Sequence, residues 1–159
     1  MDTISIVIVT YKRPDDLRNC LRSIFAQTFR PKEVFVIDNG EDEKTKELIR
    51  KKASDFAKKD ITLRYVENTR EDSLMTARNL GVQLASGSFI SMVDDDLILD
   101  KNYHREIMRV FNKYPQALAV QGYCQTTKEA HKGAKRKSLI ERTLDLYNRI
   151  FQTSVILEK

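Results

Sequence analysis

The chain has 159 residues, of which 41% are hydrophobic, so it is long and apolar enough for one domain with a buried core. Lys and Arg total 28 against 23 Asp and Glu, and the resulting net charge of +5 is too modest to require a nucleic-acid partner. No run approaches about 18 apolar residues, and the cysteines Cys20 and Cys124 lack metal-ligand spacing, which excludes a spanning helix, a disulfide scaffold and a zinc site.

The first half of the chain alternates between strand-like and helix-like segments. Residues 4–9 are short, β-branched and almost all apolar, which predicts a strand buried on both faces. A helix begins near Pro14, where proline suits the first turn. We then expect a second strand at residues 34–37, a charged helix at 41–59 and a third strand at 61–66.

The second half continues the alternation. Asp72 or Ser73 caps the next helix, and a fourth strand at residues 89–93 runs directly into three aspartates. A helix is expected at 103–114 and a fifth strand at 118–123. This order predicts an α/β fold with a mainly parallel, twisted sheet and helices on both faces.

The composition turns basic and polar near residues 126–137. We therefore expect one domain at 1–127, and a basic loop with an amphipathic helix (about 138–157) in the remainder, 128–159. The basic cluster is typical of a solvated face, but a membrane surface, a phosphate-bearing ligand or nucleic acid are alternatives. The helix would pack on the domain, on further protein, on a second copy or on an anionic membrane.

The N-terminus lacks a positive leader, and its apolar run is too short for a signal peptide. Together with the cysteine usage, this predicts a cytoplasmic protein, with peripheral membrane contact as an option.

Polar segments follow three of the predicted strands, at residues 10–14, 38–40 and 94–96. Open parallel sheets bind ligands outside the carboxyl ends of their strands, so these segments should meet at one ligand-binding edge. Neither a dinucleotide-binding glycine motif nor a phosphate-binding P-loop is present.

The triplet Asp94-Asp95-Asp96 is the strongest candidate site. Adjacent carboxylates repel one another, and Mg²⁺ or Mn²⁺ would compensate them while sharing substrate phosphates. Their alternative role is to cap the next segment or to face solvent. Asp38 either shapes a turn with Asn39 and Gly40 or hydrogen-bonds a base or ribose.

Arg78 lies on an otherwise apolar helix face. It is a snorkelling or ion-paired side chain, or it pairs with the aspartates or a phosphate.

Several motifs between residues 4 and 121 occur in the order and spacing that is typical of one protein family. They are Thr10-Tyr11-Lys12-Arg13-Pro14, Asp38, Asn68, Ala77-Arg78-Asn79, Gly81, Ala85, Gly87 and Val93-Asp94-Asp95-Asp96. In combination they resemble family 2 glycosyltransferases of the GT-A fold. The resemblance implies sugar transfer from a nucleotide-sugar donor, usually a UDP-sugar but also a GDP- or dTDP-sugar, to an acceptor hydroxyl, with Mg²⁺ or Mn²⁺ and with inversion.

The resemblance also implies roles for the nucleoside-binding residues. Asp38 would hydrogen-bond the base, and Thr10 and Tyr11 would line its pocket, with the Tyr11 ring available for stacking.

On the diphosphate side, the resemblance implies that Asp96 is the direct metal ligand. Asp95 would lie near the ribose and the metal, and Asp94 would be the first acid of the DxD pattern. Arg78 would support the diphosphate.

One departure concerns the catalytic base, which such inverting enzymes usually carry in an acidic motif well after the triplet. The late acids Glu141 and Asp145 lie in a helical pattern that indicates surface exposure, so the catalytic base is unassigned. The alternatives are therefore a truncated or inactive nucleotide-binding scaffold and, less favoured, a nucleotidyltransferase. The acceptor, lipid-linked or polysaccharide, cannot be read from these residues.

Overall fold

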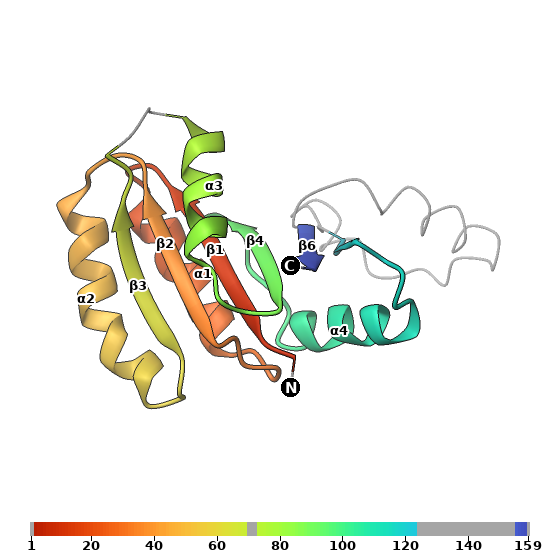
Figure 1. Ribbon diagram of the computed structural model, residues 1–159. Coiled ribbons are helices and arrows are strands. Elements are labelled where there is room, and N and C mark those ends of the chain that lie inside the picture. Colours follow the sequence, from red (N-terminus) through yellow and green to blue (C-terminus); the bar gives the residue numbers. More distant parts are fainter. Residues whose placement is uncertain (1, 70–72, 124–154, 159) are drawn as a thin grey trace, which may run out of the picture.

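The computed structural model describes residues 2–69, 73–123 and 155–158, and Figure 1 shows the arrangement of their elements. One six-stranded sheet has the order β3-β2-β1-β4-β6-β5. Its strands are β1 Ile4–Thr10, β2 Glu33–Asp38, β3 Thr62–Glu67, β4 Phe89–Asp94, β5 Ala119–Gln121 and β6 Val155–Glu158. The first four are parallel to one another, and β6 pairs antiparallel with β4 and β5.

Strand β1 lies at the centre because both of its faces are apolar. Ile4, Ile6 and Ile8 belong to the core on one side of the sheet, and Val7 belongs to the core on the other. A strand with two buried faces needs neighbours on both edges, which β2 and β4 provide.

Helices cover both faces of the sheet, as Figure 1 shows for α1 and α3. The larger core joins the sheet to α1 Pro14–Phe25, α2 Glu43–Ala57 and α4 Tyr103–Lys113. The smaller core lies under α3 Leu74–Leu84. The predicted α/β class, with a mainly parallel sheet between two helical layers, is confirmed.

The helices begin where the sequence supplies caps. Pro14 opens α1, Asp42 accepts a hydrogen bond from the Thr45 amide at the start of α2, and Ser73 does the same for Met75 in α3. Because α1 and α2 start shortly after β1 and β2 end, their first turns lie beside the carboxyl edge of the sheet.

The prediction for the C-terminal segment is wrong at its end. Residues 155–157 were expected to close an amphipathic helix, whereas the chain there is strand β6. The rest of that expected helix, the basic loop before it and the 127/128 boundary lie outside the described residues. Within the described ranges, no helix is both long and apolar enough to cross a bilayer.

Candidate functional site

The three polar strand ends meet, as the parallel-sheet rule predicts. In the register of the sheet, Thr10 at the end of β1 pairs with Asp38 at the end of β2, and Val9 pairs with Asp94 at the end of β4. The carboxyl edge of the three central strands therefore gathers the predicted site residues.

The acidic triplet splits into three environments. Strand β4 ends at Asp94, whose side chain is half-exposed. The chain then turns, burying Asp95 to 1% exposure and leaving the Asp96 side chain 53% exposed. Identical neighbours in sequence thus become a buried anchor and two accessible carboxylates.

Asp95 is held from β1 and from the loop that follows it. The Thr10 hydroxyl donates to Asp95 Oδ2 over 2.7 Å, and Arg13 Nη2 lies 3.1 Å from Oδ1. Burial is the main reason that the pKa of Asp95 is raised, with the Thr10 hydrogen bond and Arg13 opposing it. The Asp95 carboxylate is therefore fixed in orientation at a cost in desolvation.

One oxygen of Asp95 is incompletely satisfied. Although Arg13 forms an ion pair with Oδ1, its N–H groups do not align for a hydrogen bond, and Oδ1 is buried without one. The ion pair and the missing hydrogen bond are compatible, since charge attraction tolerates an angle that a hydrogen bond does not. A buried acceptor left in this state is uncommon and points to a functional position.

Two arginines offset part of the negative charge of the triplet, Arg13 from the loop after β1 and Arg78 from α3. Arg13 Nη1 also lies 3.4 Å from Asp96 Oδ2. From α3, Arg78 Nη2 lies 3.0 Å from Asp94 Oδ1, so of the alternatives for Arg78 the ion pair with the aspartates is present. Both arginine side chains are accessible enough to contact an anion placed over the edge.

Asp38 is fully buried and bonded within the protein. Its Oδ1 accepts from the Gly40 amide over 2.9 Å, and its Oδ2 accepts from the Asp42 amide and the Tyr65 hydroxyl, both also over 2.9 Å. Burial and this hydrogen bond raise the pKa of Tyr65. The turn-shaping role is thus present, and of about four lone-pair sites on a carboxylate three are used.

The loop after β1 packs against the turn after β2. A Cβ built on Gly40 would lie 3.0 Å from Lys12 Cγ and 3.2 Å from Tyr11 Cδ2, so the glycine permits a close approach. Lys12 adopts a positive φ of 52°, and the Tyr11 ring remains 51% exposed above Gly40. Tyr11 therefore offers an accessible aromatic face at the same edge as Asp38.

No role was predicted for Cys20 or Tyr65, and none for Arg13 beyond its place in the motif. Cys20 Sγ donates to the Asp94 carbonyl over 3.6 Å, and burial beside the aspartates raises its pKa to about 12, so it remains a thiol. Cys20 contacts the end of β4 and Tyr65 contacts the end of β2, and residue spacing cannot predict such contacts between elements that are distant in sequence.

The donor set decides whether a metal fits. The described residues contain no group of three or more His, Cys, Asp or Glu side chains that could hold an ion by themselves. Mg²⁺ and Mn²⁺ bound with phosphates use only one or two carboxylates and fill the remaining positions with phosphate and water oxygens. The exposed Asp96 beside Asp94 fits that arrangement.

Comparisons with known proteins now bear on this geometry. A family model described as glycosyl transferase family 2 matches residues 5–156. Glycosyltransferase GlyA of Streptococcus pneumoniae is 28% identical over 122 residues, which cover 77% of this chain and 17% of the relative. The glucosyl-dolichyl phosphate glucuronosyltransferase of Haloferax volcanii is 25% identical over 121 residues, covering 75% and 37%.

Two solved structures share the fold over 98% of this chain. TarS 1-349 of S. aureus matches with a TM-score of 0.72 and 17% identity. The mannosyltransferase PcManGT of Pyrobaculum calidifontis, solved in complex with GDP-Man and Mn²⁺, matches with a TM-score of 0.72 and 19% identity. The chain covers 47% and 44% of those structures, so it spans less than half the length of each protein it resembles here. With the family model matched along nearly all of its length, this chain belongs to glycosyl transferase family 2 and has the GT-A fold.

Proposed function

We propose that this chain binds a nucleoside-diphosphate sugar, together with Mg²⁺ or Mn²⁺, at the carboxyl edge of β1, β2 and β4 and transfers the sugar, with inversion, to an acceptor hydroxyl. The observation that carries the proposal is the acidic turn after β4. Its buried Asp95 has an oxygen without a hydrogen bond, its accessible Asp96 lies beside Arg13, and its half-exposed Asp94 pairs with Arg78.

The nucleoside would lie between the ends of β1 and β2. Tyr11 is 51% exposed and offers its ring for stacking. Asp38 has one unused acceptor position, which would reach a base N–H after a movement of the turn that buries it here. TarS has been solved with UDP and with UDP-GlcNAc, and PcManGT with GDP-Man, which supports this class of donor here. We expect UDP-sugars first, with GDP- and dTDP-sugars as alternatives.

The diphosphate would lie over the acidic turn. Asp96 would hold the ion, with Asp94 beside it, and the ion would supply charge neutralisation for the departing nucleoside diphosphate. The unsatisfied Asp95 oxygen would accept a ribose hydroxyl or an ion-bound water. Arg78 would remain on Asp94 and orient it.

Arg13 would change partners when the donor binds. In the structure it pairs with Asp95 and Asp96 and offsets one of their two negative charges, a compensation that a divalent ion would take over. A guanidinium displaced from two carboxylates lies close to the incoming phosphates, and it pairs with phosphate oxygens as readily as with carboxylates. Arg13 would thus offset part of the negative charge of Asp95 and Asp96 before the donor binds and then pair with the diphosphate.

The catalytic base and the acceptor are left unassigned. The late acids Glu141 and Asp145 lie outside the described residues. The alternative functions are a donor-binding scaffold without transfer and, less favoured, a nucleotidyltransferase. We propose a cytoplasmic enzyme acting on a lipid-linked or polysaccharide acceptor, with peripheral membrane contact or self-association through the C-terminal segment.

The test is calorimetry with UDP, GDP and dTDP, with and without Mn²⁺, on the native chain and on Asp96→Asn. We expect Mn²⁺ to strengthen binding, and Asp96→Asn to remove most of that gain, at least tenfold in affinity, because a charged ligand is lost. Asp60→Asn is the matched control, since Asp60 is exposed just before β3 and its positive φ also suits asparagine.

Two outcomes would count against the proposal. Mn²⁺-independent binding, unchanged in Asp96→Asn, contradicts the metal role. Tight binding without hydrolysis of any UDP-sugar, and without transfer to added acceptors, would favour the scaffold alternative.

A further inference from the structure

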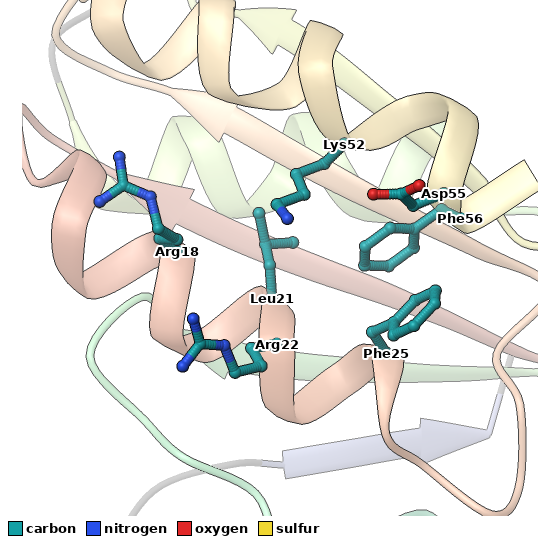
Figure 2. Close-up of a pocket in the computed structure, with 7 residues that line it drawn as sticks. All are labelled: Arg18, Leu21, Arg22, Phe25, Lys52, Asp55 and Phe56. Atoms are coloured by element: carbon teal, nitrogen blue, oxygen red, sulfur yellow. The ribbon is translucent and has the colours of Figure 1, made fainter.

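A groove on the helical layer lies apart from the residues discussed so far. It runs between α1 and α2 and is lined by Arg18, Leu21, Arg22, Phe25, Lys52, Asp55 and Phe56 (Figure 2). None of these residues belongs to the carboxyl edge. Phe25 ends α1 eleven residues after Pro14, and at about 1.5 Å per residue it lies roughly 16 Å further along the helix than Pro14, which is next to that edge.

The floor of the groove is apolar and rigid. Leu21 and Phe56 are both 1% exposed, and the rings of Phe25 and Phe56 lie 5.3 Å apart. Lys59 closes the aromatic end, with Nζ 3.9 Å from the centre of the Phe25 ring and a 2.8 Å hydrogen bond to the Phe25 carbonyl. The partly buried Phe25 ring is the accessible aromatic surface.

The rim of the groove is cationic. Arg18 and Arg22 come from successive turns of α1, and Lys52 reaches over from α2, as Figure 2 shows. Arg18 is paired with Asp15. In the part of the chain that the structure describes, neither Arg22 nor Lys52 forms an ion pair or a side-chain hydrogen bond.

The single acid of the groove does not neutralise this rim. Asp55 is engaged by Lys58, whose Nζ lies 3.3 Å from Oδ1. Two cations from two helices are thus left facing one apolar floor, and such a floor reduces screening of a bound anion.

We propose that this groove binds a phosphate monoester, with its phosphate on Arg22 and Lys52 and its organic part on the partly buried Phe25 ring. A dianion with three acceptor oxygens satisfies two cations from separate helices, which a single carboxylate does less well. The site is independent of the proposed donor chemistry, and the ligand is either a soluble phosphate monoester or the head group of a lipid such as phosphatidic acid.

The experiment titrates phenyl phosphate and inorganic phosphate into the full chain, with UDP and diamagnetic Mg²⁺ present to occupy the carboxyl edge, and follows binding by NMR. We expect phenyl phosphate to bind more tightly than inorganic phosphate. Arg22→Gln and Lys52→Gln should each lower its affinity about tenfold, the usual effect of losing one hydrogen bond to a charged group. Asp55→Asn should raise the affinity by removing repulsion.

Lys51→Gln is the matched control, because Lys51 precedes Lys52 on α2 but faces solvent in an ion pair with Glu47. Equal losses of phenyl phosphate affinity in Lys51→Gln and Lys52→Gln would show that only the net charge of the protein matters, which would overturn the proposal. Equal affinity for phenyl phosphate and inorganic phosphate would show that the aromatic floor does not contribute to binding. Competition by UDP would show that the phosphate binds at the carboxyl edge and not in the groove. Unchanged thermal unfolding midpoints confirm that each variant is folded.

A vesicle arm separates the two ligand sources. Sedimentation with phosphatidic acid vesicles that is lost in both Arg22→Gln and Lys52→Gln assigns the phosphate to a lipid head group. Binding of phenyl phosphate without vesicle binding assigns it to a soluble ligand, and binding of neither overturns the proposal.

Discussion

At the scale of single residues, Asp95 shows how a costly group is retained. A buried carboxylate is destabilising unless its oxygens are paired, and here Thr10 satisfies one oxygen while Arg13 offers the other only charge. A site selected for stability alone would complete that hydrogen bond or replace the acid. The missing hydrogen bond on Asp95 Oδ1 is typical of a position that is retained to bind a ligand.

Removing Arg13 separates its two roles. Arg13→Gln leaves the buried Asp95 charge without a counter-ion, so we expect a loss of about 1 to 2 kcal/mol in the free energy of unfolding. This is less than the roughly 3–5 kcal/mol of a fully buried pair, because the Arg13 side chain is 52% exposed. UDP–Mn²⁺ affinity should fall as well.

Urea denaturation and calorimetry on the same samples measure both effects. Arg18→Gln is the control, since its ion pair with Asp15 is exposed and should contribute less than about 1 kcal/mol. Unchanged stability in Arg13→Gln would show that Asp95 does not depend on this pair.

Asp38 requires a variant that distinguishes recognition of the base from support of the turn. Asp38→Asn presents an amide to a cluster of N–H and O–H donors, so we expect both UDP affinity and stability to fall, the latter by about 1–3 kcal/mol. Binding of pyrophosphate with Mn²⁺ should survive, because the metal side is on another strand.

Tyr65→Phe is the control for the turn, since it removes one donor to Asp38 and leaves the carboxylate in place. If Tyr65→Phe weakens UDP binding as much as Asp38→Asn does, Asp38 acts through the turn and does not contact the base.

At the scale of elements, the strands and helices of residues 4–121 were predictable because local signals agree with the fold. β1, β2 and β4 are continuous apolar runs, and Pro14, Asp42 and Ser73 are placed where helices start. β6 was not predictable, since Val155, Ile156 and Leu157 form a short apolar run that suits either element. Pairing with the free edge of β4 decides for a strand.

The site was predictable only as far as topology dictates it. Parallel strands bring the segments after β1, β2 and β4 to one edge, which the sequence order implied. Which of three identical aspartates turns inward depends on where β4 ends and on the position of the Thr10 hydroxyl, and neither is encoded in composition. Contacts of Arg13, Cys20 and Tyr65 arise from packing between elements that are distant in sequence.

Helix α3 lies unusually close to β1, and Gly81 permits this. A Cβ at Gly81 would lie 2.2 Å from Val7 Cγ1. Alanine is favoured over glycine in helices by about 1 kcal/mol, but the overlap must move α3 off the sheet, so we expect Gly81→Ala to destabilise the protein by about 1–3 kcal/mol. Arg78 lies one turn earlier on α3, so its pair with Asp94 should loosen too.

A double variant tests the cause. Val7→Ala makes room for the new methyl group, so Gly81→Ala combined with Val7→Ala should cost less than the sum of the single changes, as measured by urea denaturation. Additive losses would mean that the two side chains do not compete for space.

At the scale of the whole molecule, His104 connects α4 to β4 and to the segment after α1. It is fully buried, with Nδ1 3.1 Å from Gln27 Oε1 and Nε2 3.1 Å from Ser91 Oγ. The Gln27 amide nitrogen donates to the carbonyls of Ser23 and Asp100, so its Oε1 is an acceptor. His104 Nδ1 therefore carries the proton, and Nε2 accepts from the Ser91 hydroxyl.

This arrangement makes stability fall in mild acid. Burial lowers the pKa of His104 to about 4 from an ordinary value of 6.5, because the charged ring would lose its hydration. His104 takes up a proton in the unfolded chain as the pH falls below 6.5, but in the folded chain only near pH 4. Its contribution to the free energy of unfolding is therefore complete above pH 6.5 and is lost as the pH falls from 6.5 to 4. The shift corresponds to about 3 kcal/mol at pH 4.

Urea denaturation at half-unit steps from pH 7.5 to pH 4 measures this loss. In His104→Gln the decline between pH 6.5 and pH 4.5 should largely disappear, although the variant starts from lower stability because the buried network is changed. A slope in that interval that is the same in the native chain and in His104→Gln would show that groups other than His104 bind the proton, since the linkage relation assigns the slope to the difference in protons bound by the two states.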